Sequence, residues 1–343
     1  MKIGLAGYSG SGKSTLFHWL TGIAPDLALS HKEQSAMVPI PDERFAPLCE
    51  LYKPKKVTHA NLELVDTPGL NRNHEGAPAI LAHIREADCL VLVVGAFDKS
   101  DPVADYNSFT EDLLLADMEV VSNRLERLEA QLKRPLQKPE KEKLQFEQAV
   151  LQKVLAGLEN EKAVTLDDMT EDEQKCTRAF RLFSEKPRMV VVNCGDDESD
   201  LHRFDNCIDG VKVFAAPVSL QLELDSMEPE ESQALIEEMG LQTANKDELV
   251  RLMLDESGQM TFFTAGEPEV RTWILKKGGT ALDAAASIHT DLARGFIRAE
   301  VMTVSDLLAA GSEREVKARN QLRQEPKGYV VKDGDILLIR FSV

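Results

Sequence analysis

The sequence predicts an α/β fold with a doubly wound, mostly parallel sheet, and two observations support this. Five short runs rich in β-branched residues are typical of strands buried on both faces of a parallel sheet. They are Lys2 to Ala6, Asn61 to Val65, Cys89 to Val94, Arg188 to Val192 and Val211 to Ala215. Helical patterns begin at Lys13 and near Pro78, so strands and helices alternate along the chain. The ligand site of such a sheet lies beyond the carboxyl ends of its strands.

A long helical pattern interrupts the alternation. Its apolar residues follow the heptad spacing of a coiled-coil seam, in steps of three or four. They are Leu114, Met118, Val121, Leu125, Leu128 and Leu132. Pro135 and Pro139 end this helix, and the leucines from Leu144 to Leu158 start a second one. We therefore expect an antiparallel helical coiled-coil hairpin at residues 111–186, inserted between the two parts of a domain at 1–110 and 187–260, with its seam closed internally.

The C-terminal region, residues 261–343, has a different pattern. Val270 to Leu275 and Ile336 to Phe341 alternate as strands do, and a helix-like run from Ala281 to His289 lies between them. These elements predict a separate β-grasp domain.

Composition excludes some classes of protein. No apolar run approaches the roughly 18 residues that a membrane span requires, so we expect no membrane insertion. The net charge of −18 argues against wholesale wrapping of nucleic acid, because phosphate neutralisation by Lys and Arg dominates such binding, and we expect no DNA partner. The acidic excess lies before residue 261, so any contact with RNA is expected in the C-terminal part. The five cysteines show no C-x-x-C spacing, which favours reduced thiols in a cytoplasmic protein.

The most informative motif is Gly7-Tyr8-Ser9-Gly10-Ser11-Gly12-Lys13-Ser14-Thr15, which matches G-x-x-x-x-G-K-[ST] between a predicted strand and a predicted helix. Its glycines let backbone amides approach phosphate oxygens, and the helix that follows presents free N–H groups. We expect the residues from Gly10 to Thr15 to bind phosphates, with Lys13 reaching the β- and γ-phosphates and the Ser14 hydroxyl binding Mg²⁺.

Two further motifs follow predicted strands. Leu64-Val65-Asp66-Thr67-Pro68-Gly69 contains D-x-x-G, which places Asp66 near the metal and the Gly69 amide near a γ-phosphate. Asn193-Cys194-Gly195-Asp196 stands where GTPases of this class carry N-K-x-D to read guanine, with Cys194 in place of the lysine.

The sequence resembles the YchF family over nearly its whole length. The resemblance rests on Val38-Pro39-Ile40-Pro41-Asp42, on Ile84-Arg85-Glu86-Ala87-Asp88 and, above all, on C-terminal segments such as Phe262-Phe263-Thr264-Ala265-Gly266 and Val330-Val331-Lys332-Asp333-Gly334-Asp335. It implies an Obg-type P-loop NTPase domain, a coiled-coil insert, a C-terminal TGS domain of β-grasp fold, use of ATP in preference to GTP, and association with the ribosome or its RNA.

The chain departs from the family pattern in the base-reading and catalytic segments. The family reads the base with N-x-x-E, and Asn193 with Asp196 lies between that pattern and N-K-x-D. The resemblance and the missing lysine favour ATP, and GTP stays possible. Leu70 stands where Ras-like enzymes carry a water-orienting glutamine. The loop from Phe97 to Pro102 lacks the family's histidine, which makes His74 the nearest catalytic candidate.

The resemblance also aligns Ser30 with the family's metal-capping switch threonine, which adds it to Ser14 and Asp66 as a predicted metal ligand. Three functions remain open from the sequence. They are slow Mg²⁺-dependent ATP hydrolysis, a nucleotide-dependent scaffold with negligible turnover, and a conventional GTP-specific GTPase.

Overall fold

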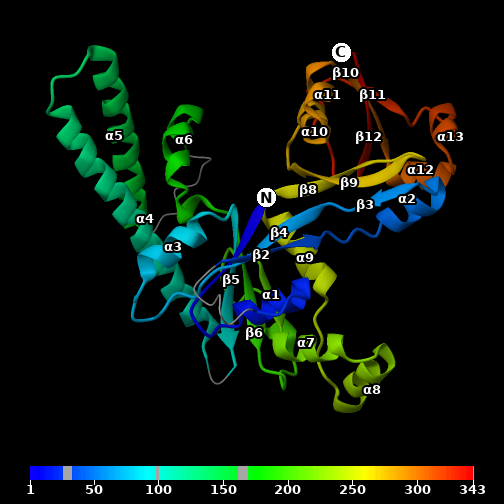
Figure 1. Cartoon of the computed structure of the whole chain (residues 1–343), viewed down its shortest axis with the longest axis horizontal. Helices are drawn as coiled ribbons and strands as arrows, with labels where there is room; N and C mark the ends of the chain where they lie inside the picture. Colours follow the sequence, from blue (N-terminus) through cyan, green and yellow to red (C-terminus); the bar gives the residue numbers. More distant parts are fainter. Residues whose placement is uncertain (26–32, 98–99, 161–168, 343) are drawn as a thin grey trace. The chain divides into compact units, whose positions relative to one another are not determined.

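The computed structural model describes residues 1–25, 33–97, 100–160 and 169–342, and Figure 1 shows its elements coloured along the chain. The chain divides into two compact units, each built from two stretches of sequence. The first contains Met1–Ala36 and Glu63–Ala244, and the second contains Met37–Leu62 and Asn245–Val343. This division does not test the three domains expected from the sequence, whose bounds stay a prediction.

The first unit is built on a six-stranded sheet in the order β2-β4-β1-β5-β6-β7. Its strands are β1 (Lys2–Ala6), β2 (Gln34–Pro39), β4 (Asn61–Asp66), β5 (Cys89–Ala96), β6 (Arg188–Cys194) and β7 (Val213–Ala216). The pairs from β4 across to β7 are all parallel, so the predicted parallel sheet is confirmed. Strand β2 was not predicted, because its residues alternate between buried and exposed instead of forming a continuous apolar run.

Helices cover both faces of this sheet, as a doubly wound fold requires. The helices that pack on it are α1 (Lys13–Thr21), α3 (Ala77–Arg85), the start of α4 (Pro102–Leu132) and α7 (Val218–Ser226). Helix α6 (Glu171–Thr177) packs on α5 (Lys138–Glu159), and α8 (Pro229–Met239) contacts α7. Short 3₁₀ turns lie at Arg178–Phe180, Phe183–Glu185 and Leu201–Phe204. Helix α3 and the start of α4 pack on one face through Ile84, Phe109 and Leu113. Helices α1 and α7 contact each other on the other face (Figure 1).

Helix α4 continues beyond the sheet and pairs with α5 (Lys138–Glu159) as an antiparallel hairpin (Figure 1). Val121 and Leu128 of α4 pack against Leu151, Val154 and Leu158 of α5, all of them fully buried. The seam is therefore closed internally, as predicted. One detail was wrong: Pro139 lies in the first turn of α5 instead of ending α4, because a helix accepts proline where its N–H has no partner in any case.

The second unit has its own six-stranded sheet, in the order β11-β10-β12-β8-β9-β3. Its strands are β3 (Lys56–Thr58), β8 (Gln259–Thr264), β9 (Glu269–Lys276), β10 (Phe296–Thr303), β11 (Arg323–Glu325) and β12 (Asp335–Phe341). Its helices are α2 (Phe45–Tyr52), α9 (Lys246–Glu256), α10 (Ala281–Ile288), α11 (Thr290–Arg294), α12 (Val304–Ala310) and α13 (Glu313–Ala318). The predicted strands at β9 and β12 and the helix at α10 are confirmed.

Each face of the second sheet has a separate core. Helix α10 packs through Ala281, Ala284 and Ala285 on one face. Helices α2 and α12 pack on the other, where Leu48 and Leu307 meet Phe263. Strand β3 pairs in parallel with β9, so residues 37–62 belong with the C-terminal region, which the sequence did not predict (Figure 1).

Within the described ranges, no helix is long and apolar enough to cross a bilayer.

Candidate functional site

The predicted phosphate loop connects β1 to α1 in the first unit. Gly12 has a φ of +97°, a left-handed conformation that L side chains rarely adopt. A Cβ added at Gly12 would also overlap the side-chain amide of Asn193. Glycine is therefore required here both by the backbone and by the close approach of β6. Gly10, with φ +86°, is exposed on the same loop, and Thr15 is half-buried on the first turn of α1.

Lys13 lies buried at the start of α1, with 5% of its surface exposed. Its ammonium donates a hydrogen bond of 2.8 Å to the carbonyl oxygen of Tyr8, across the mouth of the loop. Burial lowers the pKa of Lys13 to about 8, and the nearby Asp66 carboxylate partly opposes this shift. In the described part of the chain, this ammonium thus has one hydrogen-bond acceptor, a neutral carbonyl, which an anionic phosphate oxygen can replace.

Ser14 and Asp66 form the second part of the site. Strands β1 and β4 run in parallel with Leu5 opposite Asp66, which brings the end of β4 beside the start of α1. The Ser14 hydroxyl donates a hydrogen bond of 2.6 Å to Oδ2 of Asp66. Burial raises the pKa of Asp66, and the Ser14 hydrogen bond and the Lys13 charge oppose this rise.

The second oxygen of Asp66, Oδ1, is buried and has no hydrogen-bond partner among the residues that the structure describes. A buried carboxylate oxygen normally has a partner, so this atom is suited to a ligand. Mg²⁺ is typically bound by one or two protein oxygens together with phosphate oxygens and water, and Ser14 with Asp66 fits that need. Ser30, the third predicted metal ligand, lies outside the described residues. Elsewhere in the described part of the chain, no group of three or more His, Cys, Asp or Glu side chains could hold a metal.

Gly69 and Leu70 continue from β4 and lie against the phosphate loop. A Cβ at Gly69 would come within 2.8 Å of the Ser9 Cα and 2.9 Å of the Lys13 ammonium, so only glycine fits. Leu70 accepts a backbone hydrogen bond of 2.9 Å from Ser9, and its side chain is fully buried in the core. Leu70 therefore cannot orient a water molecule in the way that the glutamine of Ras-like enzymes does.

The predicted base-reading residues follow β6. Asn193 is buried and donates a hydrogen bond of 3.2 Å to the Ser11 carbonyl, while its Oδ1 accepts one of 3.3 Å from the Val218 amide. Asp196 is exposed, and its Oδ1 accepts a hydrogen bond of 3.2 Å from the Leu220 amide. Burial raises the pKa of the Cys194 thiol to about 12. Both predicted residues are thus oriented by the first turn of α7, which the sequence analysis did not single out.

The side chain of His74 lies near helix α4 and not beside Lys13 or Ser14. It follows Gly69 on an exposed turn with φ +58°, and its Nδ1 lies 3.7 Å from Oδ1 of Asp112 on α4. The other carboxylate oxygen of Asp112 accepts a hydrogen bond of 2.7 Å from the Tyr8 hydroxyl. The guanidinium of Arg72 lies 4.4 Å from the Tyr8 ring centroid and pairs with Asp105 of α4 at 2.6 Å.

The cluster of Tyr8, Arg72, Asp105 and Asp112 was missed by sequence reasoning. Tyr8 is itself part of the phosphate loop, and burial together with its hydrogen bond to Asp112 raises its pKa. The aromatic ring within a glycine-rich loop was the only local signal of this arrangement, because its acidic partners lie about a hundred residues further along the chain.

Comparison with known proteins identifies the family. The family model MMR_HSR1, described as "50S ribosome-binding GTPase", matches residues 2–142. A second model, YchF-GTPase_C, described as "Protein of unknown function (DUF933)", matches residues 259–342. The two matches fall on the phosphate-loop region and on the C-terminal sheet.

Similar proteins extend the match over the whole chain. The Ribosome-binding ATPase YchF of Bacillus subtilis is 34% identical, over 99% of this chain and 99% of that protein. The Obg-like ATPase 1 of Oryza sativa subsp. japonica is also 34% identical, over 100% of this chain and 92% of that protein. The structure of the Schizosaccharomyces pombe YchF GTPase matches with a TM-score of 0.81 and 27% identity, over 99% of this chain and 97% of that chain. The chain therefore belongs to the YchF family, and its first unit has the P-loop α/β fold.

Proposed function

We propose that this protein is a P-loop nucleoside triphosphatase that binds ATP with Mg²⁺, hydrolyses it slowly, and associates with ribosomes according to its nucleotide state. One observation carries the proposal: the buried Lys13 ammonium and the Ser14–Asp66 pair lie together at the carboxyl ends of β1 and β4. This combination suits a metal-bound triphosphate.

The chain's own residues supply binding and positioning. The amides from Gly10 to Thr15 surround the β-phosphate at the N-terminus of α1, where the helix dipole favours negative charge. Lys13 exchanges the Tyr8 carbonyl for phosphate oxygens, and the Gly69 amide approaches the γ-phosphate. Ser14 and the Oδ1 atom of Asp66 would hold Mg²⁺, and the ion would neutralise negative charge on the bound phosphates.

ATP is the preferred nucleotide in this proposal. Asn193 can pair with either purine, so discrimination falls to the groups around it. The lysine of N-K-x-D is replaced here by Cys194, whose neutral thiol is buried in the core. Asp196 has its Oδ1 engaged by the Leu220 amide. The missing lysine favours adenine, whereas Asp196 is the residue that the guanine-reading pattern also carries. A GTP-specific enzyme is therefore the alternative.

His74 is the proposed group that positions the attacking water. It lies on the turn that begins at Asn71, after Gly69 and Leu70, and more than half of its side chain is exposed, so it can swing toward a γ-phosphate. A second function is favoured by its present contact with Asp112 and by the burial of Leu70. In that alternative the protein is a nucleotide-dependent scaffold with negligible hydrolysis.

The partner is proposed from the printed names of the relatives. The YchF proteins of Bacillus subtilis and Haemophilus influenzae are named ribosome-binding ATPases, and a ribosomal partner implies a cytoplasmic protein. The near-neutral C-terminal region is the proposed RNA-facing part, because the acidic excess lies elsewhere in the chain.

Single-turnover assays with ATP and with GTP, each with and without ribosomes, test this proposal. We expect tighter binding of ATP than of GTP and a measurable hydrolysis rate that ribosomes change. Tight ATP binding without turnover under either condition would favour the scaffold. Preference for GTP would overturn the base assignment.

A further inference from the structure

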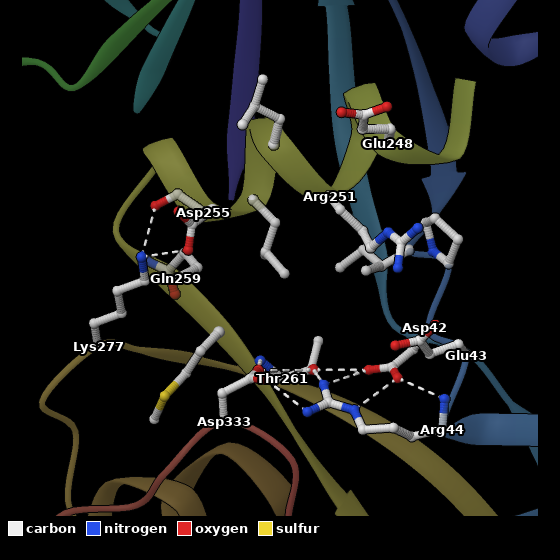
Figure 2. A pocket seen from close by; sticks show the side chains of 15 residues that line it. Asp42, Glu43, Arg44, Glu248, Arg251, Asp255, Gln259, Thr261, Lys277 and Asp333 are labelled. Atoms are coloured by element: carbon white, nitrogen blue, oxygen red, sulfur yellow. Dashed lines mark hydrogen bonds and ion pairs between the residues drawn. The ribbon is translucent and has the colours of Figure 1, made fainter. Parts of the chain in front are cut away.

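The second unit contains an open pocket of about 660 Å³, separate from the residues that form the phosphate loop. Helix α9 forms one wall, and strand β8 with the segment from Ile40 to Arg44 forms the opposite side (Figure 2). Its volume lies within the range of roughly 300–1,000 Å³ that small-molecule sites occupy. The pocket is therefore large enough for a small organic ligand.

The pocket combines apolar walls with cationic groups. Leu252 is partly exposed and supplies apolar surface, and the buried side chains of Ile40 and Met260 line the pocket with it. Arg44, Arg251 and Lys277 are the cationic side chains of its lining. A ligand that fills this space therefore needs an apolar body and a small number of polar atoms.

Two of the three cations are already neutralised by the protein. Arg44 pairs with Asp42 at 2.8 Å and with Asp333 at 2.7 Å, and it also donates a hydrogen bond of 3.1 Å to Thr261. Lys277 pairs with Asp255. Figure 2 shows both networks at the edges of the space between α9 and β8. Their charges are satisfied before any ligand arrives.

Arg251 differs from the other two. Among residues 1–25, 33–97, 100–160 and 169–342, its side chain makes no hydrogen bond or ion pair. It extends from α9 toward the segment that carries Asp42 and Glu43 (Figure 2). A guanidinium with all five donors free matches the two oxygens of a carboxylate in a bidentate pair.

The charge of the whole lining limits how negative the ligand can be. Five carboxylates line the pocket, namely Asp42, Glu43, Glu248, Asp255 and Asp333, against the three cations. These net negative surroundings would repel a dianionic phosphate. A singly charged carboxylate needs one cation, and Arg251 has no partner among the described residues. The half-buried Gln259 can donate to a further polar atom of the ligand.

We propose that this pocket binds a small organic acid, a monocarboxylate with an apolar body, whose carboxylate pairs with Arg251. The apolar body contacts Ile40, Leu252 and Met260. This site is distinct from the nucleotide site and does not depend on the function proposed for that site.

A matched series of compounds tests the proposal on the full chain. The probes are 3-phenylpropanoate, its neutral amide, 3-phenylpropylamine and 3-phenylpropyl phosphate. Methyl NMR titration reads the site directly, because Ile40, Leu252 and Met260 carry methyl groups within it. We expect saturable shifts of these methyls with the acid at millimolar concentration, and binding of the amide about tenfold weaker, as the loss of a charge-assisted pair implies.

Variants assign the effect to one side chain. Arg251→Gln should make the acid bind as weakly as the amide, while Arg251→Lys should keep part of the preference for the acid. Arg314→Gln is the matched control, because Arg314 is an exposed arginine of the same unit on α13 and outside the pocket lining. It should leave acid binding unchanged.

Several results would overturn the proposal. In the wild type, these results are no methyl shifts in the pocket with the acid, equal binding of acid and amide, or binding of the amine or the phosphate that is tighter than that of the acid. In Arg251→Gln, the contradicting result is an unchanged preference for the acid over the amide. Since Arg251 and Arg314 are both exposed, neither substitution removes a buried contact, and the fold of each variant can be checked in the same spectra.

Discussion

The hydroxyl of Tyr8 donates a hydrogen bond of 2.7 Å to Oδ2 of Asp112, which joins the phosphate loop to the long helix α4. The Tyr8 ring also packs edge-on against Phe109 of the same helix, with ring centroids 5.3 Å apart. Arg72 and His74, which follow the D-x-x-G motif, contact Asp105 and Asp112 of α4. The base of the helical hairpin is thus bonded to both phosphate-facing segments of the first unit.

Removing this hydroxyl should destabilise the protein. Tyr8→Phe leaves the buried side of Asp112 without its donor, and a hydrogen bond to a charged group contributes about 1.5–3 kcal/mol. We expect a coupling free energy of about 1 kcal/mol or more between Tyr8→Phe and Asp112→Ala in a double-mutant cycle by urea unfolding. The control is Glu111→Ala, because Glu111 is the exposed neighbour of Asp112 on α4 and should not couple with Tyr8→Phe. Additive effects for the Asp112 cycle would show that the bond contributes nothing.

Ser14→Ala should weaken the magnesium dependence of ATP binding. The hydroxyl lies 2.6 Å from Asp66 and is one of the two described groups suited to the metal. ATP affinity is measured with Mg²⁺ and with a chelator, and the ratio of the two is the magnesium effect. This ratio should be about tenfold smaller in the variant than in the wild type, which corresponds to roughly 1.4 kcal/mol. Thr21→Ala serves as control, because Thr21 lies on the same helix and its hydroxyl donates to the Phe17 carbonyl and accepts from the Ile23 amide, away from Asp66. An unchanged magnesium effect in Ser14→Ala would exclude Ser14 as a ligand.

His74→Ala should slow single-turnover hydrolysis by at least about tenfold without changing ATP affinity, since a positioned acid–base group typically contributes about 10²–10⁴ in rate. His83→Ala is the matched control, because His83 is a half-buried histidine on α3 with a carboxylate, Glu33, at 3.5 Å. Equal rates for wild type and His74→Ala would assign water positioning to another group.

Lys186 should make stability depend on alkaline pH. Its ammonium donates to the carbonyls of Arg85 and Ala87, and burial, with help from the nearby Arg181 charge, lowers its pKa to about 8. Between pH 8 and the ordinary value of 10.5, the unfolded chain keeps a proton that the folded protein has released, so the contribution of Lys186 to stability rises with pH across that window.

The comparison of wild type with Lys186→Met isolates this effect. Urea unfolding at each pH gives the free energy of unfolding of both proteins. We expect the value for the wild type minus the value for the variant to increase as the pH rises from 7.5 to 10. A difference between the two proteins that stays constant with pH would contradict the lowered pKa.

Local patterns predicted the elements whose signals are continuous in sequence. The phosphate loop and the parallel strands from β4 to β7 were recognised because each is encoded by a run of neighbouring residues. The helical hairpin was recognised from the repeat that places Val121, Leu128 and Leu151 on facing seams. The second sheet was only partly recognised, since β3 has three residues, too few for a periodicity, and its partner β9 lies about two hundred residues away.

The site was predictable to a similar extent. Lys13, Ser14, Asp66 and Gly69 lie together as the motif spacing implies, and Asn193 joins them through Ser11. The partners of Asn193 and Asp196 on α7 and the carboxylates that bind Tyr8 and Arg72 could not be predicted, because they depend on how distant helices pack on the sheet. Their residue types carry no local signal of a site.

Calorimetric titration of the folded protein with Mg²⁺ and ATP, in parallel with a Lys13→Met variant, tests the central claim most directly. We predict one-site binding in the wild type and a loss of affinity of about a hundredfold or more in the variant, since Lys13 supplies the buried positive charge of the loop. Failure of the wild type to bind either ATP or GTP at millimolar concentration, or equal binding by Lys13→Met, would contradict the account.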